Sequence, residues 1–244
     1  MTLVRTAKEI TRDLIAKSGL CRLHVSIRKF RGKNVDHLLH TSLSERFSAI
    51  YENQVWLNGR TRGSKSGSGS ELTSTENVRR CLGDLLKSLG TRTLLDIGCG
   101  DFTWMKELYF PFNYIGIDIV PSVVAANKAL YASERRAFSQ LDATQDPLPE
   151  ADTILCREVM FHLSFHDIWR LLENIRRSRC TYLIATNDDG LRYNADILSG
   201  DFRMLNLFKS PLLFPNPVRS IPDDGVLPDR TLSVWRVADL PVSK

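Results

Sequence analysis

The sequence has no apolar run long enough to cross a bilayer and no secretory leader pattern. A membrane-spanning helix needs about 20 consecutive apolar residues. Residues 1–17 carry charges throughout and lack the apolar core of a signal peptide. These absences predict a cytoplasmic protein, with at most a peripheral contact with a membrane.

Cysteine is also scarce, and its spacing excludes two kinds of stabilised scaffold. The five cysteines are scattered along 244 residues and none forms a C-x-x-C pair. This pattern argues against a disulfide framework and against a structural zinc site. No other spacing demands a metal ion, so none is predicted. With 43% hydrophobic and 25% charged residues, the chain can bury a sizeable core.

Positive charge is concentrated at the N-terminus. Residues 1–33 hold nine Lys or Arg against two acidic residues, whereas the formal net charge of the whole chain is +5. Three interpretations remain open: a helix packed on the body with a solvated basic face, a peripheral helix on an anionic membrane surface, and a nucleic-acid contact. Nucleic acid is the least favoured, because the segment lacks interleaved aromatic residues.

The first 75 residues predict a basic, mostly helical extension and a loop. Apolar residues at helical spacing predict a helix over 3–17 and another over 41–51, whereas 20–33 fits a helix or a strand equally well. Residues 1–58 form the predicted extension and 59–74 a lid loop. The loop contains most of the Gly/Ser-rich "GSKSGSGSELTST" (63–75) and leads into the domain predicted over 75–244. Such a loop is expected at the rim of a ligand cleft, as a mobile lid rather than a passive linker.

Beyond the loop, strands and helices alternate. Thr73 and Glu76 have capping-box spacing before an apolar stripe over 78–89, and Gly90 provides the stop. The predicted strands are 93–98, 114–119, 136–142, 152–156 and 181–186, and the predicted helices lie near 102–109, 121–131 and 164–175. This order predicts an α/β, Rossmann-like, doubly wound and mostly parallel sheet. An irregular insertion over 187–230 on the substrate side and a late antiparallel strand over 230–237 complete the domain.

Acidic residues end three successive predicted strands: Asp96, Asp118 and Asp142. Ligands of open α/β sheets bind outside the carboxyl ends of the strands. Gly98 and Gly100 permit a tight turn there. A dinucleotide site would place a third glycine where this chain has Thr103, which disfavours a nicotinamide-dependent dehydrogenase.

The motifs "LLDIGCGDFTW", "YIGIDIVPSVV", "QLDATQDPLP" and "ADTILCREVMFHLS" resemble, in order and spacing, those of class I S-adenosylmethionine-dependent methyltransferases. The resemblance covers about residues 75–186. It implies that the methionine end of the cofactor lies near the first motif, the ribose near the second and the adenine near the third. The residues it assigns to the cofactor are Asp96, Gly98, Cys99, Gly100, Asp118, Ile119, Asp142 and Ala143. Arg157, after the fourth strand, is a further cofactor-binding candidate, and the alternative is that it pairs with an acidic residue. The chain departs from the pattern at Phe102, where many members carry a further glycine.

A looser resemblance links residues 51–75 and the C-terminal tail to uncharacterised bacterial methyltransferases of surface-glycan gene clusters. Together these features predict methylation of a hydroxyl on a small-molecule or glycan acceptor. Two alternatives remain: an RNA or protein methyltransferase that uses the basic arm, and a non-catalytic partner subunit that keeps the fold.

Catalytic and substrate-binding candidates follow from their positions after strands four and five. His162 and Glu158 are the candidate bases, because a hydroxyl acceptor benefits from proton removal. Arg60, Arg62 and Lys65 of the predicted lid could meet an anionic group. The substrate-binding candidates are Arg62, Asp189, Asp196 and Arg203.

Overall fold

The computed structural model describes residues 10, 11, 13–15, 18, 20–57, 60, 63–109 and 111–243. Most of the helix predicted over 3–17 lies outside these residues, as does Arg62. Within them, no helix has the length and apolar character needed to cross a membrane.

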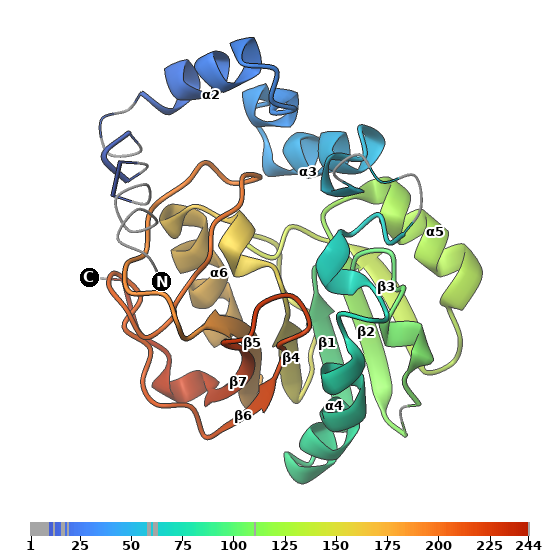
Figure 1. Ribbon diagram of the computed structural model, residues 1–244. Helices are drawn as coiled ribbons and strands as arrows, with labels where there is room; N and C mark the ends of the chain where they lie inside the picture. The colour runs from blue at the N-terminus through green and yellow to red at the C-terminus, as the bar shows by residue number, and fades with distance from the viewer. Residues whose placement is uncertain are drawn as a thin grey trace.

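A seven-stranded sheet forms the centre of the molecule, with the strand order β3-β2-β1-β4-β5-β7-β6 (Figure 1). The first five strands of this order are parallel, and β7 pairs antiparallel with both β5 and β6. The strands are β1 (Thr93–Ile97), β2 (Asn113–Asp118), β3 (Arg136–Gln140), β4 (Thr153–Cys156), β5 (Tyr182–Asp188), β6 (Arg219–Pro222) and β7 (Arg230–Arg236). The predicted fold class is confirmed, although the edge strand β6 was not foreseen.

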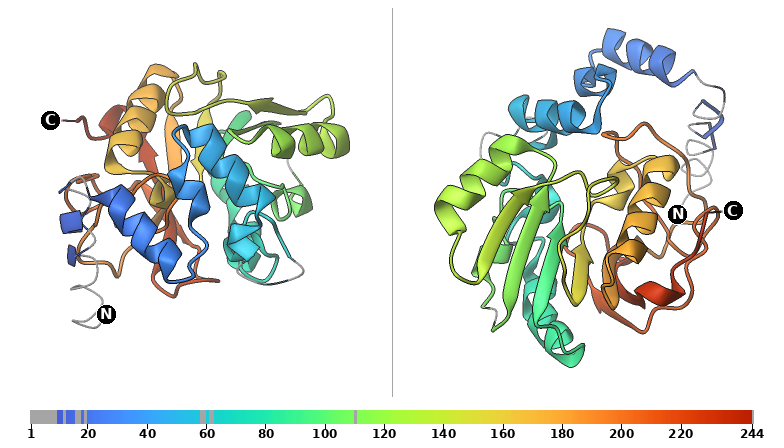
Figure 2. Two further views of the ribbon diagram at one scale, coloured as in Figure 1. Left: turned by 90° about the horizontal axis from the view of Figure 1, so that it is seen from above. Right: turned by 180° about the vertical axis from the view of Figure 1, so that it is seen from behind.

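Helices cover both faces of the sheet, as the two further views show (Figure 2). Alternate residues of β1 separate the two cores: Leu94 packs in the cluster that contains α4 (Glu76–Ser88), and Leu95 packs in the cluster that contains α6 (Phe165–Arg177). This alternation follows from the two-residue period of a strand. A third helix, α5 (Pro121–Tyr131), contributes Val124 to the α4 side and begins with proline, as predicted.

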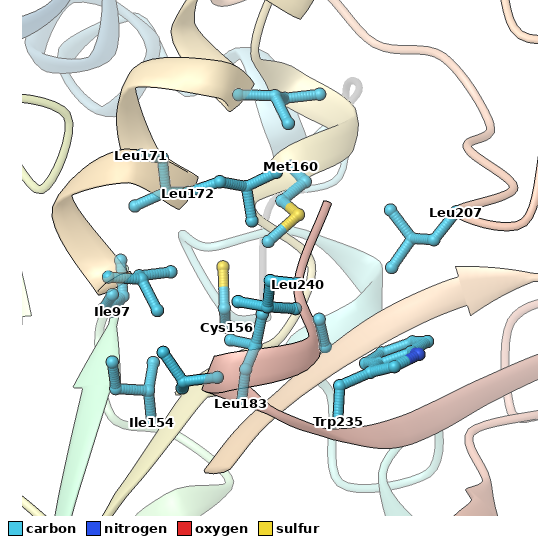
Figure 3. Close-up of a cluster of buried hydrophobic side chains, with 14 of the residues drawn as sticks. Ile97, Ile154, Cys156, Met160, Leu171, Leu172, Leu183, Leu207, Trp235 and Leu240 are labelled. Carbon is cyan, nitrogen blue, oxygen red and sulfur yellow. The ribbon is translucent and has the colours of Figure 1, made fainter. Parts of the chain in front are cut away.

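The larger core lies between α6 and the sheet (Figure 3). Leu171 and Leu172 of α6 belong to the same cluster as Ile154 of β4 and Leu183 of β5, and all four side chains are fully buried. Trp235 of β7 fills the far end, where its indole N–H donates to the carbonyl of Pro215 at 2.8 Å. Burial of such side chains supplies most of the driving force for this packing.

Two predicted helix features need correction. The capping box of Thr73 and Glu76 does not form, because Thr75 occupies the N-cap of α4 and its hydroxyl donates backward to the carbonyl of Glu71 at 2.9 Å. The helix predicted near 102–109 is reduced to one 3-10 turn over Met105–Glu107. In contrast, Ser164 caps α6 through the amide of Asp167, as predicted.

The N-terminal extension lies across the carboxyl edge of the sheet (Figure 1). Its described part includes α2 (Cys21–Phe30), a 3-10 turn over Asp36–Leu39, α3 (Leu43–Glu52) and a 3-10 turn over Val55–Leu57. The ambiguous segment 20–33 is therefore mainly helical. A capping box of Ser42 and Glu45 starts α3, and the hydroxyl of Ser44 donates to the carbonyl of Ile119 just beyond β2.

A buried ion pair joins the sheet to the tail. The guanidinium of Arg157, after β4, donates twice to the carboxylate of Asp223, after β6, at 3.0 and 2.8 Å. Both side chains are nearly inaccessible to solvent. Removing one partner of such a pair leaves the other charge buried and uncompensated.

The substitution Asp223→Ala should therefore lower the free energy of unfolding by about 3–5 kcal/mol. Its exposed neighbour provides the control: Asp224→Ala removes one surface hydrogen bond and should cost less than about 1 kcal/mol. Urea denaturation followed by circular dichroism measures both. Equal losses in the two variants would contradict a structural role for the buried pair.

Candidate active site

The turn after β1 brings backbone close to the cavity at the carboxyl edge. Gly98 and Gly100 adopt left-handed φ angles of 70° and 57°. A Cβ on Gly98 would lie 2.6 Å from the side chain of Val159, and one on Gly100 would lie 2.3 Å from Ser66 Oγ. Glycine is therefore required at both positions by conformation and by space.

Phe102 adopts a left-handed φ of 58°, although it is not glycine. Its ring is 2% exposed and packs against Tyr114, Tyr131 and Phe138, with ring centroids 5.1–5.2 Å apart. The departure from the glycine pattern thus preserves the backbone conformation that glycine would adopt and adds an aromatic contact to the core.

A cavity of about 1010 Å³, counted with its open mouth, lies at this edge between β1, β2, β4 and the N-terminal extension. Its walls include all nine residues predicted to bind a cofactor. Asp142 shapes its own turn, since one carboxylate oxygen accepts from the amide and the hydroxyl of Thr144 at 2.9 and 2.7 Å. The nine residues thus lie around one cavity, and their binding of a cofactor stays a prediction.

Two buried carboxylates dominate the electrostatics of the cavity. Burial raises the pKa of Asp96 to about 7, against the hydrogen bond from the Tyr114 hydroxyl at 2.6 Å, which lowers it. Burial also raises the pKa of Asp118, whose oxygens accept from the amides of Gly100 and Val120. In both residues the effect of burial on the pKa exceeds that of the hydrogen bonds. A positively charged ligand would therefore stabilise the ionised carboxylates, whereas a pyrophosphate would be repelled by them.

Ser66 and Ser70 of the loop predicted as a lid line this cavity, and Asp101 fastens this part of the loop. One oxygen of the Asp101 carboxylate accepts from the hydroxyl of Ser64 at 2.8 Å and from the amide of Lys65 at 2.7 Å. In return, Ser66 Oγ accepts from the amide of Asp101 and hydrogen-bonds to the hydroxyl of Tyr51. Ser64 is buried by these contacts.

Arg60 and Lys65, the described basic residues of the lid, do not line the cavity. Arg60 pairs with Glu71 at 3.1 Å, and Lys65 is exposed outside the cavity walls. Instead the lid presents Ser66 and Ser70 to the cavity and brings Gly69 against the carboxylate of Glu158. A Cβ at Gly69 would overlap that carboxylate, so a larger residue there would require the Glu158 side chain to move.

A second pocket adjoins the first and shares Trp56, Ser66, Glu158 and His162 with it. Beyond these shared residues its walls are largely apolar, with one buried arginine. They comprise Gly67, Ser68, Gly69, Phe161, Phe202, Met204, Val226, Leu227 and Arg230. Sequence reasoning missed Trp56, Phe202 and Arg230, because they come from loops and strand ends far apart in the chain. The tryptophan within "NQVWLNGR" was the one available signal.

His162 stands where the two pockets meet. Its ring lies against Trp56, Phe161 and Phe202, with centroids 4.9, 4.7 and 5.7 Å away. Burial lowers the pKa of His162 to about 4, so the imidazole is neutral near pH 7. Nδ1 lies 2.9 Å from the carbonyl oxygen of Asp201. Since a carbonyl can only accept, Nδ1 carries the proton and Nε2 is the basic nitrogen.

Glu158 lies beside His162 in a left-handed conformation, with φ of 58°. Its carboxylate pairs with Arg230 at 2.5 Å, and its amide donates to the hydroxyl of Thr186. Such a strained backbone in a non-glycine residue is typical of functional sites. Arg230 also donates to Asp188, so the tail strand β7 holds Glu158 in place.

Three predicted substrate residues lie away from both pockets. Asp189 accepts from Asn187 and Thr231 at the edge of the sheet. Asp196 accepts from the first amide of α6, and Arg203 is buried over the ring of Phe165 while donating to the carbonyl of Leu163. These contacts organise the tail, and none of the three residues lines either pocket. Among the described residues, no group of His, Cys, Asp or Glu is arranged to hold a metal ion.

Residues 95–179 match the family model described as "Methyltransferase domain", which covers about a third of the chain. The strand order and the acid-lined edge agree with that match. This part of the chain therefore matches a methyltransferase domain in sequence, and its sheet has a Rossmann-like strand order. No sequence match among curated proteins is significant.

Solved structures with a similar fold include the N-methyltransferase NodS from Bradyrhizobium japonicum WM9, with 18% identity, a TM-score of 0.48 and coverage of 66% of this chain and 98% of that one. Human N-acetylserotonin methyltransferase in complex with SAM has 20% identity and a TM-score of 0.42. That alignment covers 69% of this chain but 48% of the human protein. Magnesium protoporphyrin IX methyltransferase from Synechocystis PCC 6803 with bound SAH has 15% identity and a TM-score of 0.45, with coverage of 61% and 72%. Values this low carry no inference about the acceptor.

The hydrogen bonds of the Asp101 carboxylate predict how the lid responds when this carboxylate is removed. In Asp101→Ala the lid loses its anchoring carboxylate, and trypsin should cleave after Lys65 at least about tenfold faster, because local opening becomes easier. Mass spectrometry of timed digests measures this rate. Glu107→Ala, an exposed acid beyond the same turn, should digest like the parent protein. An unchanged rate in Asp101→Ala would show that other contacts hold the lid.

Proposed function

We propose that the protein transfers a methyl group from S-adenosylmethionine to a hydroxyl of a small-molecule or glycan acceptor. The observation that carries this proposal is the position of His162. Its basic Nε2 belongs to a ring that borders both the cofactor cavity and the adjoining pocket. A hydroxyl must lose its proton as it is methylated, whereas a neutral amine can be methylated without a base.

The residues around the cofactor cavity fit the proposed ligand. The buried carboxylates of Asp96 and Asp118 suit a molecule with a cationic sulfonium and ammonium. Asp96 lies beside the glycine turn at the proposed methionine end. At the next strand end, Asp118 keeps lone pairs for ribose hydroxyls, and Ile119 provides an apolar surface for the base. Asp142 and Ala143 line the place proposed for the adenine edge.

The chain's contribution to chemistry is alignment, dehydration and proton removal. When bound, the cofactor supplies an electrophilic methyl group on a positively charged sulfur. Lid residues Ser66 and Gly69 exclude water from the meeting point of the two pockets. His162 Nε2 accepts the acceptor's proton, and the nearby carboxylate of Glu158 stabilises the resulting imidazolium.

The second pocket supports a ring-shaped acceptor with polar groups. Trp56 and Phe202 present aromatic surfaces around His162, while Glu158 and Arg230 offer acceptor and donor groups nearby. Aromatic faces with a few placed polar groups are typical of small-molecule sites. A sugar or a hydroxylated aromatic ring satisfies both requirements.

Calorimetric titration with S-adenosylmethionine and with NAD tests the cofactor assignment. The parent protein should bind the former and not the latter. Asp118→Ala should weaken binding by about tenfold to a hundredfold, since hydrogen bonds to a charged group are lost. Thermal melts confirm that the variant is folded. Tight binding of NAD, or unchanged binding by Asp118→Ala, would refute the assignment.

Release of S-adenosylhomocysteine with a panel of methyl glycosides, phenols and amines tests the proposed base. His162→Gln should reduce turnover of hydroxyl acceptors by about 10²-fold or more while leaving cofactor affinity unchanged. At saturating cofactor, whose positive charge keeps Asp96 ionised, the imidazole stays neutral above its pKa of about 4. Therefore kcat should be flat from about pH 5.5 to 8 and should fall only in more acidic buffer. An inflection near the ordinary histidine pKa, or full activity in His162→Gln, would contradict the role.

A further inference from the structure

Helix α2 exposes its apolar residues instead of burying them. Leu23, Ile27 and Phe30 are 56%, 42% and 93% exposed, and they lie on one face because they are spaced by three or four residues. Leu20, just before the helix, extends the same stripe and is also exposed. In contrast, Val25 on the opposite face is buried against Val35 and Leu38. The helix thus packs through a narrow face and leaves its larger apolar face open.

Basic side chains lie beside this stripe. The segment 20–39 contains five Lys or Arg against a single acidic residue, Asp36. Asp36 pairs with Lys29 at 3.0 Å, and Arg31 and Lys33 are exposed just beyond the helix. The surface formed by the apolar stripe and these cations, called here the α2 surface, combines hydrophobicity with strong positive charge.

Charge decides which occupant this surface fits. A second copy of the chain would bring two strongly basic segments together, which is unfavourable. A nucleic acid would satisfy the cations but leave the apolar stripe in water. An anionic lipid surface satisfies both, because the stripe enters the boundary between headgroups and acyl chains while Lys and Arg meet the phosphates.

We infer that the α2 surface is a peripheral docking site for an anionic membrane. The helix projects beyond the sheet and its flanking helices, so a flat partner can approach it (Figures 1 and 2). Arg28 of α2 makes a bidentate ion pair with Asp201 at 2.6 and 3.2 Å. The next residue along the chain, Phe202, lines the second pocket. Docking of α2 therefore holds the second pocket near the lipid surface. This inference does not depend on the proposed reaction.

Co-sedimentation of the full-length protein with sucrose-loaded vesicles tests the site without cofactor or acceptor. Vesicles of phosphatidylcholine with phosphatidylglycerol should bind at least about tenfold more tightly than phosphatidylcholine alone. Leu23→Ser/Phe30→Ser should reduce binding at least about tenfold, because the stripe no longer inserts. Arg31→Gln/Lys33→Gln should reduce it about fivefold per charge.

Matched double variants outside the N-terminal segment provide controls. Tyr109→Ser/Leu130→Ser removes two side chains that are 91% and 70% exposed, and Lys106→Gln/Arg135→Gln removes two exposed charges. Both controls should bind like the parent protein. Equal binding to neutral vesicles, or unchanged binding by Leu23→Ser/Phe30→Ser, would overturn the inference. Absence of vesicle binding would also overturn it. Self-association or binding of an RNA oligonucleotide that the α2 variants abolish would then identify the other occupant of the α2 surface.

Discussion

The carboxylate of Asp118 holds together the two loops on which the cofactor cavity depends. One oxygen accepts from the amide of Gly100 after β1, and the other accepts from the amide of Val120 after β2, each at 3.0 Å. Parallel pairing of β1 with β2 brings these loops to the same edge. The charge that organises them is itself buried, so the same group that shapes the cavity also favours a cationic ligand.

The lid and the tail complete this edge from opposite ends of the chain. Asp101 fastens the lid, and Arg157 and Arg230 connect the strand ends to Asp223, Glu158 and Asp188 of the sheet and tail. In the part of the chain that the structure describes, Arg230 Nη2 is buried without a hydrogen-bond partner. An imperfectly satisfied charge cluster of this kind is costly, and it lies beside the second pocket, which Arg230 lines.

Sequence patterns predicted the parallel core, and they grouped the strand-end acids that line one cavity, because both features depend on local signals. A buried strand, a turn and an acid at the strand end lie within a few residues of each other, as in "LLDIGCG". The second pocket depends instead on long-range packing, because Trp56, Phe202 and Arg230 come together from segments with no periodic pattern. The capping box failed for a related reason, since Thr75 competes with Thr73 for the helix start and only the folded turn decides between them.

At Phe102 the cost of a strained backbone is set against the stabilisation from a buried aromatic ring. Its left-handed backbone costs about 1–2 kcal/mol relative to glycine. A return to glycine would relieve that strain, but it would empty a site enclosed by Tyr114, Tyr131 and Phe138, at a cost of about 3–5 kcal/mol for loss of a buried phenylalanine. A glycine at this position therefore requires compensating changes in the surrounding rings. The packing of the ring outweighs the strain of the backbone at this turn.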